Sequence, residues 1–386
     1  MPDPMSQRPG RRVLIVMDAY LPGRLAGGPV TSVANMIEAL RGEIEFVVVT
    51  RNADLNGELY PDVPLGTPVA VGAASVIYLA GADFRARNIL KIAASLQADT
   101  LYLNSFFSVR TIRLLLQLSS RRGLFRAVVL APRGEFSPGA LALKAKKKRV
   151  YLQLFQRLHL QQVVTTFQAS SPLEERDIYR ALGPVRVKVA ADMPDITAAG
   201  PASAAPASAR LVFIGRISPM KNLLYSLQLL TTLQQPIEFD IYGPLEDQGY
   251  WQQCQRVMAT LPPQIKVAYR GVLTHEAVTA TFACYTAFLL PTQGENYGHV
   301  VLEALSGGCP VILSDRTPWQ DLNAYGVGWV CDLDEPSQFR KAVAQVLNES
   351  AEEAQARRER CVAYAQRVAS DPEVREDNLQ LFAPGA

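Results

Sequence analysis

The sequence predicts two doubly wound α/β domains, each built on a parallel sheet covered by helices. The chain has 386 residues, which is more than one ordinary hydrophobic core accommodates. Short apolar runs of strand length alternate with segments of helical periodicity throughout, a pattern typical of parallel sheets with helical crossovers. A small, proline-rich and uncharged stretch, TAAGPASAAPASA at 197–209, separates the two halves and has the composition of a linker.

These patterns set the expected domain boundaries. We predict a first domain over residues 1–195, a linker at 196–209 and a second domain over 210–369. The last helical segment has no strand after it, so residues from about 370 to 386 are expected to pack back onto the first domain. The ligand of such a protein is expected at the carboxyl ends of the strands, in a cleft between the domains.

The individual elements follow from two periodicities, short apolar runs for buried strands and a spacing of three to four residues for helices. The predicted strands are 13–17, 45–50, 75–79, 100–103, 127–131 and 163–169 in the first half, and 210–214, 237–242, 266–270, 287–290, 310–313 and 328–330 in the second. The predicted helices include 30–40, 109–121, 223–233, 276–283 and 336–348, followed by 351–368 and 372–382.

Composition excludes several classes of protein. An apolar content of 48% with 19% charged residues describes a folded globular chain and excludes a disordered one. No apolar run approaches the roughly 20 residues that span a bilayer, and the first residues lack the apolar region of a signal peptide. The five cysteines form no C-x-x-C pair and there are only three histidines, which predicts a cytoplasmic protein without a zinc site.

The charge is unevenly distributed along the chain. Residues 1–195 carry a net +9 and residues 196–386 a net −6, so the first half is expected to face an anionic partner. The segment KAKKKRVYLQLFQRLHL at 144–160 mixes a basic cluster with apolar residues. One interpretation is an amphipathic face resting on the anionic inner surface of the plasma membrane; the other is an ordinary helix with a core stripe and a solvated basic side. A nucleic-acid partner is less favoured, because the cluster is short and the second half is acidic.

The most informative segment is GENYGHVVLEALSGGCPVILSD at 294–315. A helix starting near Gly298 places Glu295 in the preceding loop and Glu303 in the second turn. The free N–H groups of the first turn lie between these carboxylates and favour a phosphate group. A sugar nucleotide, with phosphates between two hydroxyl-bearing ends, fits this arrangement.

A second segment, LVFIGRISPMKNLLYSLQLL at 211–230, carries two cations. A strand ends at Gly215, Arg216 follows the turn, and Lys221 precedes a helix. Two cations beside a strand end and a helix start predict a diphosphate clamp. The alternative is a solvated pair of surface charges.

Together these segments resemble the family 4 retaining glycosyltransferases, also called glycosyl transferases group 1, which have the GT-B fold. The resemblance rests first on GRISPMKN followed by GENYGHVVLEAL and PVILSD. Further matching segments are TPW at 317–319, GVGW at 326–329, AGGPV at 26–30, LNSFFS at 103–108 and PRGEFSPGALALKAKKKRVY at 132–151.

The resemblance implies a role for each residue of the second-domain site. Arg216 and Lys221, beside Gly215, would hold the donor diphosphate and stabilise it as it leaves. Glu303 would bind the ribose hydroxyls and Glu295 the hydroxyls of the transferred sugar. The backbone near the sugar and phosphate would come from Asn296, Tyr297 and Gly298.

In the first domain the resemblance implies that Gly27 and Gly28 form a loop that closes over the donor phosphates. Arg133 stands where many members carry a histidine that contacts the donor sugar. We hypothesise that Arg133 faces the donor sugar or the reaction centre; the alternative is a salt bridge with Glu135 or Asp18. Further candidates are Glu135 as acceptor of a proton, His299 near the diphosphate on the same helix face as Glu303, and Asn104.

The function expected from this resemblance is a retaining transfer without metal or other cofactor. The donor would be a UDP- or GDP-sugar and the acceptor a hydroxyl of a glycan, lipid-linked, in bacterial surface polysaccharide biosynthesis. The alternatives are a nucleotide-sugar epimerase or hydrolase on the same fold, and a non-catalytic sugar-nucleotide-binding subunit. A dinucleotide dehydrogenase is excluded, because the first strand is followed by no G-x-G-x-x-G.

Overall fold

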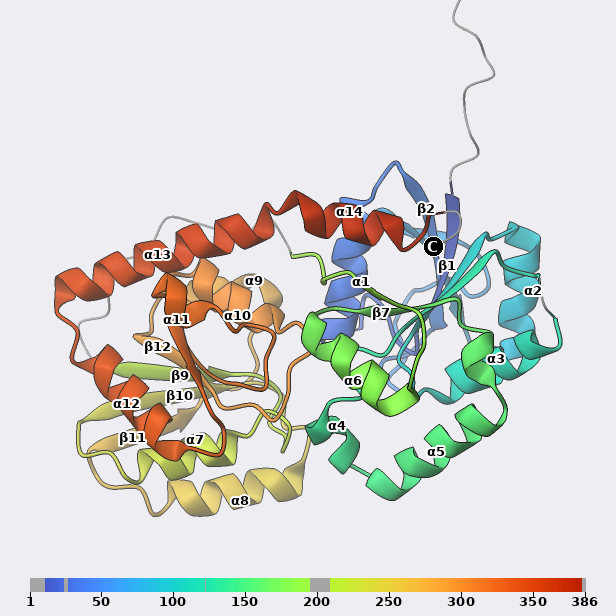
Figure 1. Cartoon of the computed structure of the whole chain (residues 1–386). Coiled ribbons are helices and arrows are strands. Elements are labelled where there is room, and N and C mark those ends of the chain that lie inside the picture. Colours follow the sequence, from blue (N-terminus) through green and yellow to red (C-terminus); the bar gives the residue numbers. More distant parts are fainter. Residues whose placement is uncertain (1–10, 24–26, 122, 195–208, 384–386) are drawn as a thin grey trace, which may run out of the picture. The chain divides into compact units, whose positions relative to one another are not determined.

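The computed structural model describes residues 11–23, 27–121, 123–194 and 209–383 (Figure 1). Nearly all of the predicted linker at 196–209 lies outside these described residues. The chain divides into two compact units, Met1–Met193 with Pro372–Ala386, and Pro194–Asp371. Each unit is considered by itself.

The described part of the first unit contains an eight-stranded sheet with the order β3-β4-β2-β1-β5-β6-β7-β8. Its strands are β1 Arg11–Val16, β2 Ile44–Arg51, β3 Val69–Val71, β4 Ala74–Leu79, β5 Thr100–Asn104, β6 Ala127–Ala131, β7 Thr166–Ala169 and β8 Val187–Val189. Neighbouring strands pair in parallel except β3 and β4, which pair antiparallel. The predicted parallel sheet is confirmed, and the two short edge strands β3 and β8 were not predicted.

Helices cover both faces of this sheet (Figure 1). They are α1 Gly28–Ala39, α2 Ala86–Leu96, α3 Val109–Ser119, α4 Pro138–Ala142, α5 Ala145–Arg157, η1 Leu160–Gln162, α6 Pro172–Leu182 and α14 Pro372–Gln380. Because successive strand residues point to opposite faces, Leu14 belongs to one core and its neighbours Val13 and Ile15 to the other.

The last helix belongs to the first unit. Just beyond α14, Phe382 is buried with its ring 5.7 Å from that of Phe46 and 5.9 Å from that of Tyr102. The side-chain amide of Asn378 donates to the carbonyl of Ala191 at 2.7 Å. The carboxyl-terminal segment therefore completes the core of the unit in which the chain began.

The second unit has a parallel sheet of order β11-β10-β9-β12-β13-β14 among its described residues. Its strands are β9 Arg210–Ile214, β10 Ile237–Tyr242, β11 Ile265–Tyr269, β12 Ala287–Leu290, β13 Val311–Ser314 and β14 Gly328–Cys331. Its helices are α7 Leu223–Leu230, α8 Gln248–Met258, α9 His275–Phe282, α10 His299–Ser306, α11 Leu322–Tyr325, α12 Pro336–Leu347 and α13 Ala351–Ala369. The chain adds strands on one side of β9 and then, from β12, on the other. The order therefore reverses between β9 and β12, which is the topological switch point where ligands of such sheets bind.

A buried arginine fixes two helices of this unit against α13. The guanidinium of Arg358 donates to the carbonyls of Tyr285 (3.0 Å), Ala283 (2.6 Å) and Gly307 (3.4 Å). Ala283 and Gly307 are the residues at which α9 and α10 end. A cation at the carboxyl end of a helix stabilises it through the helix dipole, so Arg358 holds both helices in place.

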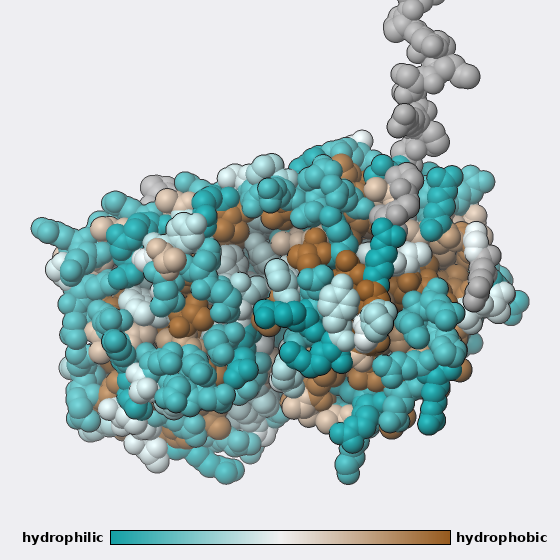
Figure 2. All heavy atoms as spheres, in the orientation of Figure 1, coloured by the Kyte–Doolittle hydropathy of each residue, from teal (hydrophilic) through white to brown (hydrophobic). Residues whose placement is uncertain are grey.

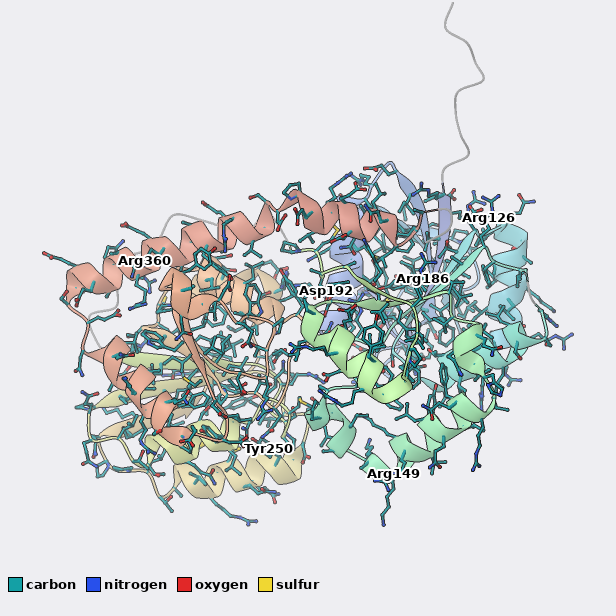
Figure 3. The ribbon with its side chains drawn as sticks, viewed as in Figure 1. Arg126, Arg149, Arg186, Asp192, Tyr250 and Arg360 are labelled. Atoms are coloured by element: carbon teal, nitrogen blue, oxygen red, sulfur yellow. The ribbon has the colours of Figure 1, made fainter. Side chains whose placement is uncertain are left out.

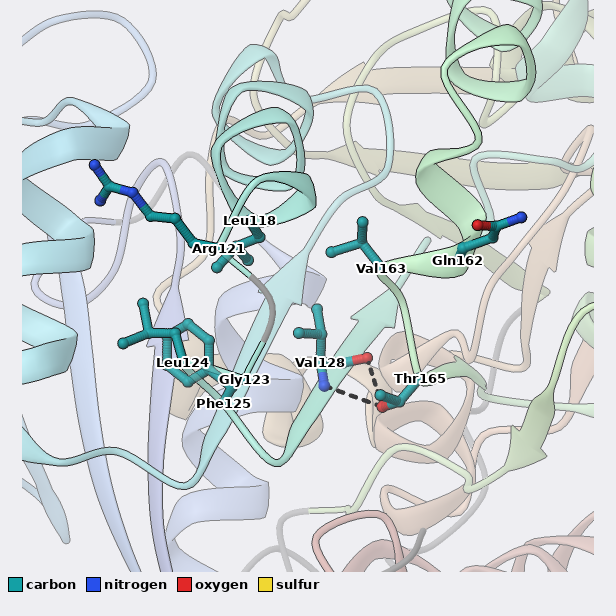
Figure 4. Close-up of a pocket in the computed structure, with 9 residues that line it drawn as sticks. All are labelled: Leu118, Arg121, Gly123, Leu124, Phe125, Val128, Gln162, Val163 and Thr165. Carbon is teal, nitrogen blue, oxygen red and sulfur yellow. Dashed lines mark hydrogen bonds between the residues drawn. The ribbon is translucent and has the colours of Figure 1, made fainter.

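In the first unit, a hollow of about 240 Å³ lies at the edge of the sheet where β6 and β7 begin (Figure 4). This edge is opposite to the carboxyl ends of the strands, where a ligand is expected. Its walls come from the segments before β6 and β7, where the hydroxyl of Thr165 is bonded to the backbone of Val128 at 3.0 Å. The guanidinium of Arg121 points away from the other lining side chains in Figure 4. No predicted site residue lines this hollow.

Among the described residues, none of the helices combines the length and apolarity needed to cross a bilayer.

Candidate active site

Two loops meet at the carboxyl ends of β9 and β10. The N–H of Gly215 donates to the carbonyl of Tyr242 at 3.0 Å, and Gly243 lies directly against Gly215. A Cβ at Gly243 would come 1.9 Å from the carbonyl oxygen of Gly215, and its φ of 138° is one that other residues rarely adopt. The absence of a side chain at Gly243 therefore allows the backbone of Gly215 to pack directly against it at the ends of β9 and β10.

The predicted clamp residue Lys221 meets the predicted sugar-binding carboxylate Glu295. The ammonium of Lys221 donates to Oε1 of Glu295, and the two side chains are only 15% and 7% exposed. Lys221 follows β9 and Glu295 follows β12, so this ion pair bridges the switch point of the sheet. Two residues that are 74 positions apart in sequence are thus brought together where a ligand is expected.

Hydrogen bonds fix the loops that carry this pair. The hydroxyl of Thr292 and the N–H of Gln293 both donate to the carbonyl of Met220, at 3.0 and 2.8 Å. The side-chain amide of Asn222 donates to the carbonyl of Pro291 at 2.8 Å, and the hydroxyl of Ser314 donates to the carbonyl of Thr292 at 2.6 Å. The loops after β9, β12 and β13 consequently form one connected support.

The helix predicted to start near Gly298 is α10, which begins at His299. Gly298 is its N-cap, with a φ of 81°, and no side chain caps the helix start. Glu303 lies in the second turn, as predicted, and its Oε1 is 3.6 Å from Nδ1 of His275 at the start of α9. The ring of Tyr297 lies 4.9 Å from that of His299, so the residues around the helix start pack closely.

Arg216, the other predicted clamp cation, has a different partner. It is half exposed, and its Nη1 lies 3.0 Å from Oε2 of Glu246 in the loop after β10. The structure therefore brings Lys221 to Glu295 but pairs Arg216 with Glu246. A surface pair of this kind contributes at most about 1 kcal/mol, so a phosphate could take over Arg216 at small cost.

In the first unit, Gly27 and Gly28 lie at the start of α1, at the end of the segment that follows β1. Gly27 is exposed with a φ of 55°, and its carbonyl accepts from the N–H of Val30 at 3.0 Å. A Cβ on either glycine would meet nothing within 4 Å, so backbone conformation rather than crowding explains a glycine at 27. Ala26, which precedes them in the AGGPV segment, lies outside the described residues.

Arg133 is buried in an ion pair that the sequence pattern does not predict. Its Nη1 donates to Oδ1 of Asp192, and the two side chains are 6% and 3% exposed. Its Nε donates to Asn104 at 2.8 Å and its Nη2 to the hydroxyl of Tyr102 at 2.7 Å. The suggested salt bridge with Glu135 or Asp18 is wrong, because Asp192, in the segment after β8 and labelled in Figure 3, takes that place.

The surroundings of Arg133 are held by further hydrogen bonds. Oδ2 of Asp192 accepts from the hydroxyl of Ser32 on α1 at 2.7 Å. The hydroxyl of Tyr102 donates to Gln168 at 2.6 Å, and burial raises the pKa of Tyr102 to about 12, which keeps it protonated. Arg133 thus links β5, α1 and the segment after β8.

Glu135 also has its oxygens occupied by neighbouring groups. It accepts from the hydroxyl of Ser105 (2.7 Å) and from the N–H groups of Phe106 (2.6 Å) and Phe107 (3.0 Å). Burial raises the pKa of Glu135, while these hydrogen bonds act in the opposite direction. Through these hydrogen bonds Glu135 supports the loop before α3. Its role as acceptor of a proton stays a prediction.

Sequence reasoning missed four residues around the predicted sites. Asp192 and Glu246 are the partners of Arg133 and Arg216, and His275 faces Glu303. Trp319, known beforehand only as part of the TPW segment, donates its indole N–H to the carbonyl of Tyr297 at 2.6 Å. Partners so far apart along the chain leave no local signal.

Two doubly wound units, with a lysine–carboxylate pair at the switch point of the second, place the protein among the two-domain α/β proteins. The model of the family described as glycosyl transferases group 1 matches residues 203–368, most of the second unit. This match includes the segments that carry Lys221, Glu295 and Glu303.

A curated relative and two solved structures are similar to this chain. The O-antigen chain mannosyltransferase B of Escherichia coli is 30% identical over 144 residues, a match that spans 36% of either chain. The sucrose-phosphate synthase of Thermosynechococcus elongatus has 15% identity and a TM-score of 0.71, over 96% of this chain and 98% of that one. HepE of Anabaena, solved with UDP and glucose, has 16% identity and a TM-score of 0.70, over 96% of this chain and 98% of that one. These likenesses confirm the predicted GT-B fold class, while the predicted central cleft stays a prediction.

Proposed function

We propose that this protein is a retaining, metal-independent glycosyltransferase of family 4. It transfers a sugar from a UDP- or GDP-sugar to a hydroxyl of a lipid-linked glycan in bacterial surface polysaccharide biosynthesis. The observation that carries the proposal is the Lys221–Glu295 pair at the switch point of the second unit. The family match over residues 203–368 and the similarity to an O-antigen chain mannosyltransferase support the same conclusion.

The charges of this site suit the transfer of a sugar from a diphosphate. The acceptor oxygen forms a bond to the anomeric carbon, the bond from that carbon to the phosphate oxygen breaks, and the acceptor proton passes to the departing phosphate. Negative charge then grows on the nucleoside diphosphate, where Lys221, Arg216 and the start of α10 would stabilise it. When Lys221 turns to the phosphate, Glu295 becomes available to accept hydrogen bonds from the sugar, and Glu303 from the ribose.

Two rival functions make different use of the same site. An epimerase or hydrolase would convert the donor without an acceptor, and a non-catalytic subunit would bind it without turnover. A second unit that needs only to bind the nucleotide has no need of the nearly buried Lys221–Glu295 pair, which favours catalysis. Incubation of the donor alone, followed by NMR of the sugar, separates the three possibilities.

The first prediction concerns binding of the donor. A panel of UDP- and GDP-sugars, added at a hundred times Kd, should include one that stabilises the fold by about 2.7 kcal/mol through mass action. The measurement is thermal unfolding with each compound, with ADP-sugars as the comparison. If no nucleotide sugar raises the unfolding temperature, the proposed function is wrong.

We also propose that α5 rests on an anionic membrane. Phe155 points inward, with its ring 4.7 Å from Phe106. Val150, Leu154 and Leu158, spaced four residues apart, are instead 64%, 45% and 42% exposed and form an apolar stripe. Figure 2 shows hydrophobic and hydrophilic side chains intermingled where α5 lies, and Arg149 extends outward from that helix in Figure 3.

Charge complementarity favours a lipid surface as the partner of this stripe. The exposed cations around it are Lys144, Lys146, Lys147, Arg149 and Arg157. Residues 136–173 contain no aspartate or glutamate at all. Each lysine or arginine near an anionic surface contributes about 1 kcal/mol, and the apolar stripe adds burial of its own.

The second prediction tests this surface with vesicles. The double variant Val150→Glu/Leu154→Glu should lose at least about tenfold in binding to phosphatidylglycerol-containing vesicles, because it places carboxylates in the apolar stripe. Leu59→Glu is the matched control, since Leu59 is 66% exposed and lies outside this stretch. Cosedimentation measures the bound fraction. Equal binding of wild type and double variant, or of neutral and anionic vesicles, would contradict the membrane proposal.

A further inference from the structure

The segment from Glu295 to Gly298 lies between β12 and α10, directly before the helix, and forms part of the proposed donor site. It contains Glu295, which pairs with Lys221, and it ends at Gly298, the N-cap of α10. No side chain caps the start of this helix. Lys221 holds one end of the segment, and groups that pack against the segment contribute to its orientation.

The turn after β13 supplies this support at two points. The carbonyl of Arg316 accepts from the N–H of Glu295 at 3.1 Å. Trp319, which is 6% exposed, donates its indole N–H to the carbonyl of Tyr297 at 2.6 Å. Its ring also lies 5.5 Å from the ring of Tyr297. One turn thus contacts both ends of the segment.

The hydrogen bond from Trp319 fixes a peptide plane. In a trans peptide the carbonyl of one residue and the N–H of the next point in opposite directions. Because the carbonyl of Tyr297 is held toward Trp319, the N–H of Gly298 is turned to the other side. Nε1 of Trp319 also lies 3.4 Å from the position that a Cβ at Gly298 would take, so the two residues are in close contact.

Trp319 is held in turn by the long helix α13. The ring of Tyr364 on that helix lies 6.3 Å from the ring of Trp319. The hydroxyl of Tyr364 donates to Asp321 at 2.6 Å, which ties α13 to the turn that carries Trp319. The indole consequently has packing on two sides and a single polar task, the bond to Tyr297.

We propose that Trp319 is a positioning residue for nucleotide-sugar binding. It fixes the Tyr297–Gly298 peptide, and with it the start of α10, in the orientation that receives the diphosphate. This inference rests on the proposed function, since it concerns the affinity of the same site. The indole N–H of Trp319 would thus determine the geometry of a site that is otherwise formed by charged side chains and backbone groups.

The test compares two tryptophan-to-phenylalanine variants. Trp319→Phe keeps an aromatic ring and removes the N–H that bonds Tyr297. Trp329→Phe is the matched control. Nε1 of Trp329 donates to the side chain of Gln345 at 2.8 Å, and this bond does not involve the donor loops. The measurements are Kd for UDP and GDP by calorimetry, KM for donor and for acceptor, and the unfolding temperature.

We expect Trp319→Phe to raise the Kd of the nucleotide and the donor KM about tenfold, with the acceptor KM unchanged, as loss of one buried hydrogen bond implies. Trp329→Phe should leave all of these values unchanged. Equal donor constants in the two variants would overturn the positioning role alone. A wild-type protein that binds neither nucleotide would overturn the proposed function as well, so the two failures are distinguishable.

Fluorescence gives a second readout if Trp319→Phe folds poorly. The chain has three tryptophans, so the variant Trp251→Phe/Trp329→Phe keeps only Trp319 as a reporter. Addition of the nucleotide that binds the wild type should change its emission, because the indole contacts the segment that receives the diphosphate. An unchanged spectrum at saturating nucleotide would contradict the inference.

Discussion

Replacing Lys221 by alanine should lower the rate of sugar transfer about 10²- to 10³-fold, equivalent to about 2.7–4 kcal/mol of transition-state stabilisation. The ammonium of Lys221 lies at the switch point, where the leaving diphosphate would gain negative charge. Glu295→Ala should be comparably damaging, because it removes the acceptor for the sugar hydroxyls. The measurement is kcat and KM for transfer with the donor identified by thermal unfolding.

Stability must be separated from catalysis in these variants. Breaking a buried pair by removing one partner costs about 3–5 kcal/mol, and Lys221 and Glu295 are only 15% and 7% exposed. The pair between Arg357 and Glu349 has a similar exposure, 17% and 11%, and lies on α13 and the residues before it. Arg357→Ala should therefore lose stability without losing turnover. Full transfer by Lys221→Ala would show that the assignment of this site is wrong.

Local patterns in the chain predict the elements that carry the second-unit residues well. The apolar spacing after Gly298 defines α10, and Glu303 falls in its second turn because the helix starts one residue later. Lys221 and Glu295 follow two strands that the apolar runs define, β9 and β12. Parallel strands present their carboxyl ends at one edge, so identifying both strands is enough to bring the two residues to the same edge.

Interactions between distant segments are harder to predict. Glu135 and Asp18 were the suggested partners of Arg133, yet Asp192 lies 59 residues away and follows β8. That strand has three residues and no pattern long enough to reveal it. The hydrogen bond from Trp319 to Tyr297 cannot be predicted from the sequence either. Its acceptor is a backbone carbonyl, which every residue type has, so the sequence does not mark the partner. Such contacts depend on the folded geometry rather than on residue pattern.

Replacing Arg133 by methionine should lower the free energy of unfolding of the first unit by about 3–5 kcal/mol, because the buried carboxylate of Asp192 would lose the guanidinium paired with it. Asn104 and Tyr102 would each lose a donor as well. Chemical denaturation measures the change. Arg126→Met is the matched control, since Arg126 is exposed and lies 3.5 Å from Asp99, a surface pair worth about 1 kcal/mol or less.

The double variant Arg133→Met/Asp192→Leu distinguishes a structural role from a catalytic one. Removing both charges avoids leaving the carboxylate of Asp192 without its guanidinium, so much of the lost stability should return. If transfer returns with it, Arg133 acts through the fold, and the hypothesis that it faces the donor sugar is wrong. If stability returns and transfer does not, the guanidinium itself contributes to the reaction. Because Arg133 is only 6% exposed in its pair with Asp192, we expect the first of these two results.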